Sequence, residues 1–288
     1  MSKEATVAAE TARFGARLVT AMRTHGPLCI GIDPHPELLD QWGLPDTPDG
    51  VARFTDTVLE AVAGQVAAVK PQSAFFERHG SGGIVVLERL LDDLRSTDTL
   101  SVLDVKRGDI GSTMRAYADA YLQDGAPLAA DAITVTPYLG VGSLTSAVEL
   151  AQATGRGLFV LALTSNPEAP ALQHAGEPPV ARAVVEEVAR LNDGRDPVGD
   201  IGLVVGATVG DTPQRLGIDL AGAGAVVLAP GVGAQGATPQ NLARTFAGLE
   251  QRVLVPVSRG ILSAGPSPER IRSATARFGS ELTSRLWS

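Results

Sequence analysis

Eight short apolar runs, separated by segments with helical spacing, constrain the fold of this chain more than any other feature. The runs cover residues 28–32, 66–69, 100–103, 132–135, 157–162, 201–205, 225–228 and 253–257. They are continuous rather than alternating, which is typical of strands in a parallel sheet that is covered on both faces. Helices are expected between most of them, over residues 52–63, 83–95, 112–123, 143–153, 180–192, 212–222 and 239–249.

Eight strand–helix units in a chain of 288 residues predict an α/β fold, a closed (β/α)8 TIM barrel. An open doubly wound sheet is the alternative, because it has the same local pattern. The number of units and the absence of a break in composition favour the barrel, as a single domain over residues 1–288. Apolar residues near helical spacing predict an extra helix over residues 7–25, within an N-terminal extension of residues 1–27.

Composition excludes several classes of partner. The formal net charge is −8 and no basic run is present, so neither a nucleic acid nor an anionic membrane is an expected partner. No apolar run is long enough to span a bilayer, and the first residues lack the pattern of a secretory signal. The single cysteine, Cys29, lies inside an apolar run, so no disulfide framework is expected. We therefore expect a soluble cytoplasmic protein.

Polar residues follow nearly every predicted strand, where a barrel places its active site. They are Asp33, Lys70, Asp104 with Lys106, Thr136, Thr164 with Ser165, Thr208, the glycine-rich residues 231–236, and Ser258 with Arg259. Of the 24 lysines and arginines only three are lysines, yet two of these three stand at strand ends. Unlike arginine, lysine can give up a proton under the influence of its neighbours. This convergence predicts that Lys70 and Lys106 take part in chemistry.

The predicted loops after the seventh and eighth strands have the composition of a phosphate site. Residues 231–236 match the pattern Gly-x-Gly-x-x-Gly, and Arg259 follows the eighth strand. A dinucleotide-binding fold would carry this pattern after its first strand, whereas barrels bind phosphate with the loops after strands seven and eight. The four histidines show no metal-ligand spacing. We therefore expect a phosphorylated ligand and no metal.

Purely structural explanations exist for several of these residues. Asp33 precedes a proline and could cap a turn, and Asp109 could be a solvated loop charge beside Arg107. Asp104 and Lys106 have the same parity in a strand, so they are expected to point the same way and could form a plain ion pair.

The segment from Asp104 to Thr113 resembles the central motif of the orotidine 5′-phosphate decarboxylase family. The family pattern Asp-x-Lys-x-x-Asp-Ile-x-x-Thr is met by Asp104, Lys106, Asp109, Ile110 and Thr113. Other stretches similar to family motifs, in the family's order, are residues 70–77, 163–167, 230–236 and 258–261. The resemblance covers nearly the whole barrel and is strongest to the longer bacterial branch of the family.

The resemblance implies a barrel that converts orotidine 5′-monophosphate to uridine 5′-monophosphate and CO2, the last step of de novo pyrimidine synthesis. The family needs no metal or organic cofactor. Lys106 would stabilise the carbon that CO2 leaves and give it a proton, and Asp104 would crowd the substrate carboxylate and hold Lys106. Lys70 would complete the charge network and contact the ribose.

Further roles follow from other matched positions. Asp109 matches the family aspartate that enters the neighbouring subunit's site, which implies a homodimer. The resemblance implies that Asp33 contacts a ribose hydroxyl, that Ser165 contacts the pyrimidine amide, and that Gln235 and Arg259 contact the phosphate. Four further positions are implied to bind substrate, namely Ile110, Thr113, Thr164 and Ser258. Many family members have glycine where this chain has Ser258, which bears on the geometry of that loop.

Two other functions fit part of the pattern. A sugar-phosphate decarboxylase or aldolase on the same barrel would use Mg²⁺ and an additional acidic ligand, for which Glu77 is the nearest candidate. A barrel that binds a nucleotide phosphate without chemistry would keep Gln235 and Arg259 but would not need Lys106 between two carboxylates. A requirement for Mg²⁺ would favour the first of these alternatives.

Overall fold

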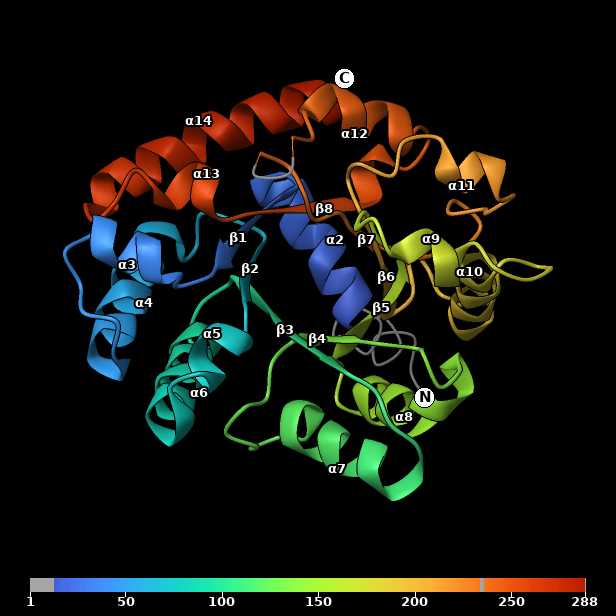
Figure 1. Cartoon of the computed structure of the whole chain (residues 1–288), viewed down its shortest axis with the longest axis horizontal. Coiled ribbons are helices and arrows are strands. Elements are labelled where there is room, and N and C mark those ends of the chain that lie inside the picture. The colour runs from blue at the N-terminus through green and yellow to red at the C-terminus, as the bar shows by residue number, and fades with distance from the viewer. Residues whose placement is uncertain (1–12, 234–235, 288) are drawn as a thin grey trace, which may run out of the picture.

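Eight parallel strands close into a barrel in which each strand pairs with the next in sequence and β8 pairs with β1 (Figure 1). The structure is a computed structural model, and it describes residues 13–233 and 236–287. The strands are β1 (Leu28–Ile32), β2 (Ala68–Pro71), β3 (Leu100–Arg107), β4 (Ala132–Val135), β5 (Gly157–Leu163), β6 (Ile201–Val205), β7 (Val227–Leu228) and β8 (Val253–Val257). The closed order confirms the predicted barrel and excludes the open doubly wound sheet.

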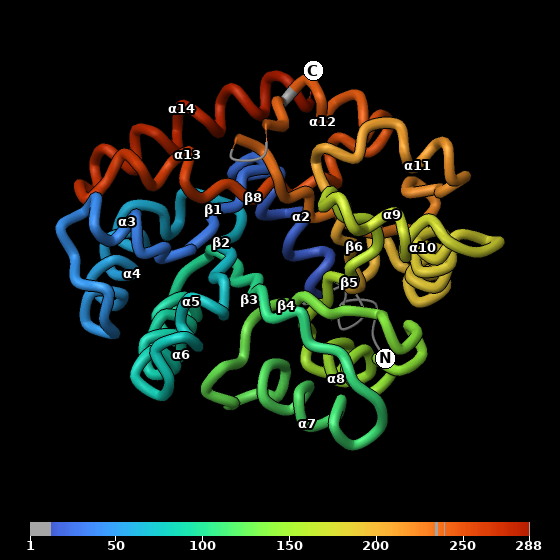
Figure 2. The backbone as a smooth tube through the Cα atoms, viewed as in Figure 1, coloured from blue at the N-terminus to red at the C-terminus, as the bar shows by residue number. Residues whose placement is uncertain are grey.

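Helices surround the barrel, with at least one after every strand (Figures 1 and 2). The α-helices are α2 (Phe14–His25), α3 (Pro36–Gln41), α4 (Pro48–Val62), α5 (Ala74–Glu77), α6 (Gly80–Arg95), α7 (Gly111–Leu122), α8 (Thr145–Ala153), α9 (Ala169–Gln173), α10 (Val180–Leu191), α11 (Thr212–Arg215), α12 (Pro239–Thr245), α13 (Arg259–Leu262) and α14 (Pro268–Leu286), and the 3-10 helices are η1 (Val141–Leu144) and η2 (Glu250–Arg252). Within the described ranges, no helix is long and apolar enough to cross a membrane.

Several elements differ from the sequence prediction. β3 continues to Arg107 instead of ending at residue 103, so Asp104 and Lys106 lie within the strand. The helix predicted over residues 212–222 ends at Arg215, because Gly217 follows with a φ of 63°, which no helix can continue.

The remaining differences lie at the two ends of the chain. The predicted helix over residues 7–25 is seen as α2 from Phe14 onward, and residues 7–12 lie outside the described residues. The last helix, α14, was not among the predicted segments, because it buries a narrow stripe and is otherwise polar. Its start is nevertheless marked in the sequence, since Ser267 accepts from the N–H of Arg270 and Pro268 follows the cap.

α2 closes the end of the barrel at which the strands begin (Figure 1). Its apolar face is buried against side chains from the barrel interior, and the ring of Phe14 meets that of Phe159 edge-on at 6.0 Å. Arg17 pairs with Asp131 at 2.7 Å, and the N–H of Gly15 donates to Asp200 at 2.9 Å. Because these two aspartates precede β4 and β6, the helix is fixed to the amino ends of the strands. The carboxyl ends, with their polar residues, lie at the opposite end.

Candidate active site

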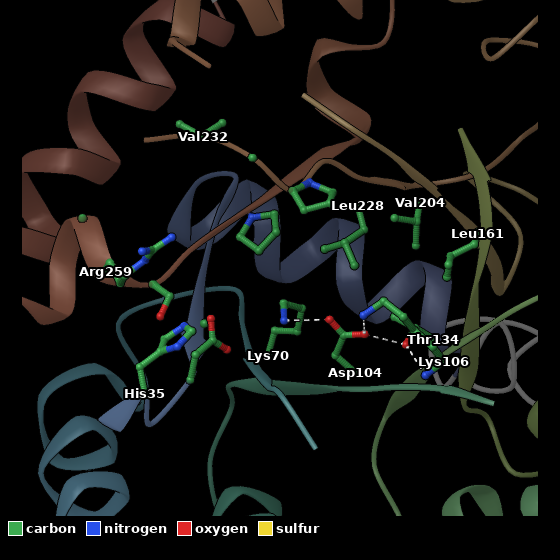
Figure 3. A pocket seen from close by; sticks show the side chains of 17 residues that line it. His35, Lys70, Asp104, Lys106, Thr134, Leu161, Val204, Leu228, Val232 and Arg259 are labelled. Carbon is green, nitrogen blue, oxygen red and sulfur yellow. Dashed lines mark hydrogen bonds and ion pairs between the residues drawn. The ribbon is translucent and has the colours of Figure 1, made fainter. Parts of the chain in front are cut away.

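A pocket of about 310 Å³ lies at the carboxyl ends of the strands (Figure 3). Every strand contributes at least one residue to it, namely Gly31, Lys70, Asp104, Thr134, Leu161, Val204, Leu228 and Pro256 in the order β1 to β8, and β3 also contributes Lys106. Asp33, His35, Ser258, Arg259, Gly260 and residues 230–232 complete the lining. The fold therefore gathers in one pocket six side chains that the sequence analysis selected: Asp33, Lys70, Asp104, Lys106, Ser258 and Arg259.

Asp104 lies between two lysines, one on each carboxylate oxygen. Lys70 Nζ lies 2.9 Å from Oδ2, and Lys106 Nζ lies 2.5 Å from Oδ1. Lys70 comes from the neighbouring strand β2 and is buried, and its ammonium also donates to Gln72 Oε1 at 3.3 Å. The side chain of Lys106 is 46% exposed. The ammonium of Lys106 is therefore the one that a ligand in the pocket can reach.

Burial and neighbouring charges oppose each other in setting the protonation of this group. Burial by itself raises the pKa of Asp104, but the charges of Lys70 and Lys106 outweigh burial and lower the pKa to about 2. Burial lowers the pKa of Lys70, but the carboxylates of Asp104 and Asp33 outweigh it, so the net pKa is raised. Asp104 is therefore an anion and Lys70 a cation near neutral pH. Burial also raises the pKa of the Cys29 thiol to about 12, which leaves no thiolate nucleophile there.

Thr134 on β4 belongs to the site, although the sequence analysis did not single it out. Its hydroxyl donates to Asp104 Oδ1 at 2.8 Å and accepts from the backbone N–H of Lys106 at 3.0 Å. A signal was present, because Thr134 is a polar residue inside the apolar run 132–135, and it is buried. Thr136, which stands at the predicted strand end, does not line the pocket.

The backbone of Lys106 adopts the left-handed region, with a φ of 45°, and it is the one non-glycine residue with positive φ in the described part of the chain. A conformation of this kind costs about 1–3 kcal/mol and persists only where the surroundings fix it. Here the register of β3 against β4 shifts between Leu103 and Arg107, and the hydroxyl of Thr134 holds the N–H of Lys106. The irregular strand thus determines where the ammonium of Lys106 lies.

The other end of the pocket contains buried polar atoms that lack a partner. Asp33 Oδ1 and Ser258 Oγ are buried, and no described residue is hydrogen-bonded to either atom. Buried polar atoms are nearly always paired, so these two oxygens are suited to bind a ligand. Gly31 permits their close approach, because a Cβ there would lie 2.9 Å from Ser258 Cβ and 3.3 Å from Asp33 Oδ2. Arg259, the first residue of α13, lines the same end (Figure 3).

Thr164 and Ser165, two predicted substrate-binding residues at the end of β5, are not part of this lining. Thr164 follows β5 and is held by Gln173 of α9. The N–H of Thr164 donates to Gln173 Oε1, and Gln173 Nε2 donates to the hydroxyl of Thr164, both at 2.8 Å. Ser165 lies against Gly206, where an added Cβ would be 3.2 Å from Ser165 Oγ. Gln235 lies outside the described residues.

Asp109, Ile110 and Thr113 lie where β3 leads into α7, outside the pocket of their own chain. Asp109 Oδ1 accepts from the N–H of Ile110 at 2.8 Å. Ile110 is 62% exposed, and the loop after β4 carries two further exposed apolar residues, Tyr138 and Leu139. Two consecutive loops at the carboxyl ends of the strands thus present large apolar side chains to the outside.

Glu77, the nearest candidate for a metal ligand, is engaged away from the pocket. Its Oε1 accepts from Arg107 at 2.6 Å and from Ser73 at 2.7 Å, and it is not part of the lining. Across the residues that the structure describes, no group of three or more histidine, cysteine, aspartate or glutamate side chains is placed to hold a metal ion. Glu77 therefore does not offer the acidic ligand that a Mg²⁺-dependent sugar-phosphate enzyme would need.

Comparisons with known proteins agree on one family. The model of the family described as "Orotidine 5'-phosphate decarboxylase / HUMPS family" matches residues 26–274. Two curated relatives are named orotidine 5′-phosphate decarboxylase. The one from Salinispora arenicola is 54% identical over 92% of this chain and 95% of the relative. The one from Streptomyces coelicolor is 52% identical over 93% of this chain and 96% of the relative. A crystal structure from Streptomyces avermitilis superimposes with a TM-score of 0.92 at 50% identity and covers 96% of each chain. These matches confirm the resemblance seen in the sequence, and the chain belongs to the orotidine 5′-phosphate decarboxylase family of carboxy-lyases.

Proposed function

We propose that this site decarboxylates orotidine 5′-monophosphate to uridine 5′-monophosphate and CO2, the last step of pyrimidine nucleotide synthesis, with Lys106 as the proton donor. The observation that carries the proposal is the position of Asp104 between Lys70 and Lys106 in a pocket that Arg259 also lines. The substrate has a carboxylate at one end and a phosphate at the other. Charged side chains suited to each end lie in the same pocket (Figure 3).

In the reaction, the bond between the carboxyl carbon and the ring carbon breaks, CO2 leaves, and the electron pair stays on the ring carbon. The ammonium of Lys106, which Asp104 holds in place, stabilises this charge and transfers its proton to the carbon. Lys106 then regains a proton from solvent, to which its side chain is partly exposed. Because these charges are in place before the substrate arrives, little reorganisation is needed as the carbanion develops.

Asp104 contributes by staying ionised beside the substrate carboxylate. Its pKa of about 2 means that it does not relieve the repulsion by taking up a proton. The repulsion fades as CO2 leaves, so it raises the energy of the bound substrate relative to the transition state. Binding of the phosphate and ribose, which take no part in bond breaking, offsets this cost.

The other proposed substrate contacts involve the phosphate, the ribose and the pyrimidine ring. Arg259 forms charge-assisted hydrogen bonds with the phosphate, and Gln235 joins it there. Asp33 Oδ1, which has no partner among the described residues, accepts from a ribose hydroxyl, and Ser258 binds beside it. Ser165 recognises the pyrimidine amide, with Thr164 adjacent at the end of β5.

We further propose that the active unit is a homodimer in which Asp109 enters the site of the partner subunit. The position of Asp109, Ile110 and Thr113 outside the pocket of their own chain supports this arrangement. The exposed side chains of Tyr138 and Leu139 on the neighbouring loop support it as well, because a second copy would bury them.

We also propose that the reaction needs no metal and no organic cofactor. The two lysines supply the positive charge, Lys106 supplies the proton, and no electron acceptor is required. A cytoplasmic location is supported by the single cysteine, Cys29, which is buried as a free thiol.

The test is the change in ultraviolet absorbance of orotidine 5′-monophosphate when purified protein is added in excess EDTA. Conversion to uridine 5′-monophosphate would establish both the reaction and its independence of metals. Conversion only after Mg²⁺ is restored, or only of sugar phosphates, would favour the sugar-phosphate enzyme instead. Binding of uridine 5′-monophosphate without conversion would indicate a nucleotide-binding protein.

A further inference from the structure

His35 lies in the pocket near Arg259, and the mechanism above leaves it without a role. It lines the pocket together with Asp33, Ser258 and Arg259. Figure 3 shows His35 and Arg259 on one side of the pocket and Lys106 on the other. If the reacting carbon lies at Lys106, the part of the nucleotide that passes His35 is the ribose and its phosphate.

The local sequence holds the backbone of His35 in one conformation. The residue stands between Pro34 and Pro36, and proline fixes its own φ and restricts the residue before it. The N–H of His35 donates to the carbonyl oxygen of Asp33 at 2.7 Å, which ties it to the end of β1. His35 is also the residue that precedes α3, yet its side chain makes no capping hydrogen bond to the described residues of that helix. The imidazole is therefore not used to begin the helix.

The ring itself is held from one side. Its centroid lies 4.2 Å from that of Phe75, with an angle of 61° between the ring planes. The side chain of His35 is neither fully buried nor fully exposed, and it points into the pocket on the side of Arg259 (Figure 3). Phe75 thus limits the orientations that the imidazole can take, which lowers the entropic cost of using it to bind a ligand.

The groups around His35 are arranged for a polar ligand. Asp33 Oδ1 and Ser258 Oγ are two buried atoms that lack partners among the described residues, and both residues line the same pocket as His35. None of the described residues is hydrogen-bonded to the imidazole of His35 either. Three polar groups with open hydrogen-bonding capacity therefore line the pocket together with Arg259.

We propose that His35 donates a hydrogen bond to the 5′-phosphate of the nucleotide, beside Arg259, and thereby helps the site to select phosphorylated ligands. The inference rests on the proposed function only in taking a nucleoside 5′-monophosphate as the ligand. A phosphate offers several oxygen acceptors, and one arginine does not satisfy them all. In a chain with a net charge of −8 and with Asp33 nearby, a second donor at this end also offsets repulsion of the dianion.

Two substitutions separate hydrogen bonding from packing. His35→Phe keeps an aromatic ring against Phe75 but has no N–H, whereas His35→Gln keeps an N–H donor but loses the ring. His25→Gln is the matched control, because His25 ends α2 at the opposite end of the barrel. The measurement is the affinity of each variant for uridine 5′-monophosphate and for uridine, by titration calorimetry.

We expect His35→Phe to bind uridine 5′-monophosphate about tenfold more weakly, as for loss of a hydrogen bond to a charged group, and uridine unchanged. His35→Gln should retain most of the affinity for the nucleotide, and His25→Gln all of it. A normal affinity of His35→Phe for the nucleotide would overturn the inference, as would equal losses for nucleotide and nucleoside.

Turnover of orotidine 5′-monophosphate by the unaltered protein is measured in parallel. If the unaltered protein shows no turnover, but His35→Phe still loses affinity for the nucleotide alone, the decarboxylase proposal fails and the role of His35 stands. If turnover is found and the nucleotide affinity of His35→Phe is normal, the decarboxylase proposal stands and the role of His35 fails. Absence of any binding of uridine 5′-monophosphate by the unaltered protein would overturn both.

Discussion

Lys106 and Asp104 form an ion pair between residues two positions apart on one strand, with Nζ 2.5 Å from Oδ1. In a regular strand the Cα atoms of two such residues stand about 6.6 Å apart, with parallel side chains, so the lysine has to fold back to reach the carboxylate. The positive φ of Lys106 and the register shift of β3 against β4 lie at this point of the chain. The strain in the strand is therefore part of how the site positions its proton donor.

Replacing Lys106 should remove turnover while leaving nucleotide binding nearly unchanged. We expect Lys106→Ala to lower kcat by at least about 1,000-fold, because both the stabilising charge and the proton are lost. Lys106→Arg keeps the charge but gives up no proton at working pH, so it should also be inactive. Absorbance assays and calorimetry with uridine 5′-monophosphate measure the two effects separately. Near-normal turnover of Lys106→Arg would remove proton transfer from the role of Lys106.

The hydroxyl of Thr134 should affect the chemical step more than binding. It connects Asp104 Oδ1 to the N–H of Lys106, so Thr134→Val breaks both hydrogen bonds at almost constant volume. We expect kcat to fall about tenfold, as for the loss of one or two hydrogen bonds, with KM nearly unchanged. Thr134→Ser restores the hydroxyl and should restore most of kcat. If serine and valine behave alike, Thr134 is needed for packing and not for its hydrogen bonds.

Much of this barrel could be predicted because buried parallel strands have continuous apolar sequences. Each of the eight runs overlaps one strand, and the residues at their ends converge because the barrel closes. The local backbone conformation could not be predicted as well. The left-handed backbone of Lys106 has no signature in the sequence, since positive φ is expected at glycine. The bulge that produces it depends on pairing with β4, which lies about 30 residues further along the chain.

The candidate site shows a similar division. Side chains that follow the apolar runs, such as Asp33, Lys70 and Arg259, could be selected because carboxyl ends of barrel strands carry the chemistry. Thr134 and His35 could not be selected by that argument, because Thr134 lies inside a strand and His35 belongs to an irregular loop. Whether each faces the pocket depends on the direction of its side chain, and that direction follows from tertiary structure.

Asp104 should contribute to stability as well as to catalysis. Asp104→Asn leaves Lys70 buried with one carboxylate fewer, so we expect a loss of about 3 kcal/mol in the free energy of unfolding at pH 7. The pKa of Asp104 is about 2 in the folded state and about 3.9 when unfolded, so its contribution is fully present above pH 4. It is lost progressively as the pH falls from about 4 through about 2, so the difference between the two proteins should narrow over that range.

Urea unfolding from pH 7 to pH 2.5 measures this difference. Asp56→Asn is the control, because Asp56 pairs with Arg89 at 2.9 Å on the surface, with both side chains about half exposed. That change should cost less than about 1 kcal/mol. A stability of Asp104→Asn equal to or above that of the unaltered protein at pH 7 would show that the crowded charges are strained rather than mutually stabilising.

Mixtures of two inactive variants should regain activity if Asp109 acts in the partner subunit. Lys106→Ala lacks the proton donor, and Asp109→Ala lacks the residue that lies outside the pocket of its own chain. In a mixed dimer, one of the two sites receives Lys106 from one chain and Asp109 from the other, and the second site receives neither. Random pairing of equal amounts makes half of the dimers mixed, so about one quarter of the sites should be active.

The recovered activity must be compared with the exchange of subunits, which a mass tag on one variant reports after separation by native mass spectrometry. If Asp109 acted in its own chain, every site with Lys106 would lack Asp109, and mixing would restore nothing. Recovery of about one quarter, in proportion to the mixed dimers, therefore distinguishes a shared site from two independent ones. A further substitution, Ile110→Asp, should lower the recovered activity, because it puts a charge where we expect the partner to bury the exposed apolar side chain of Ile110.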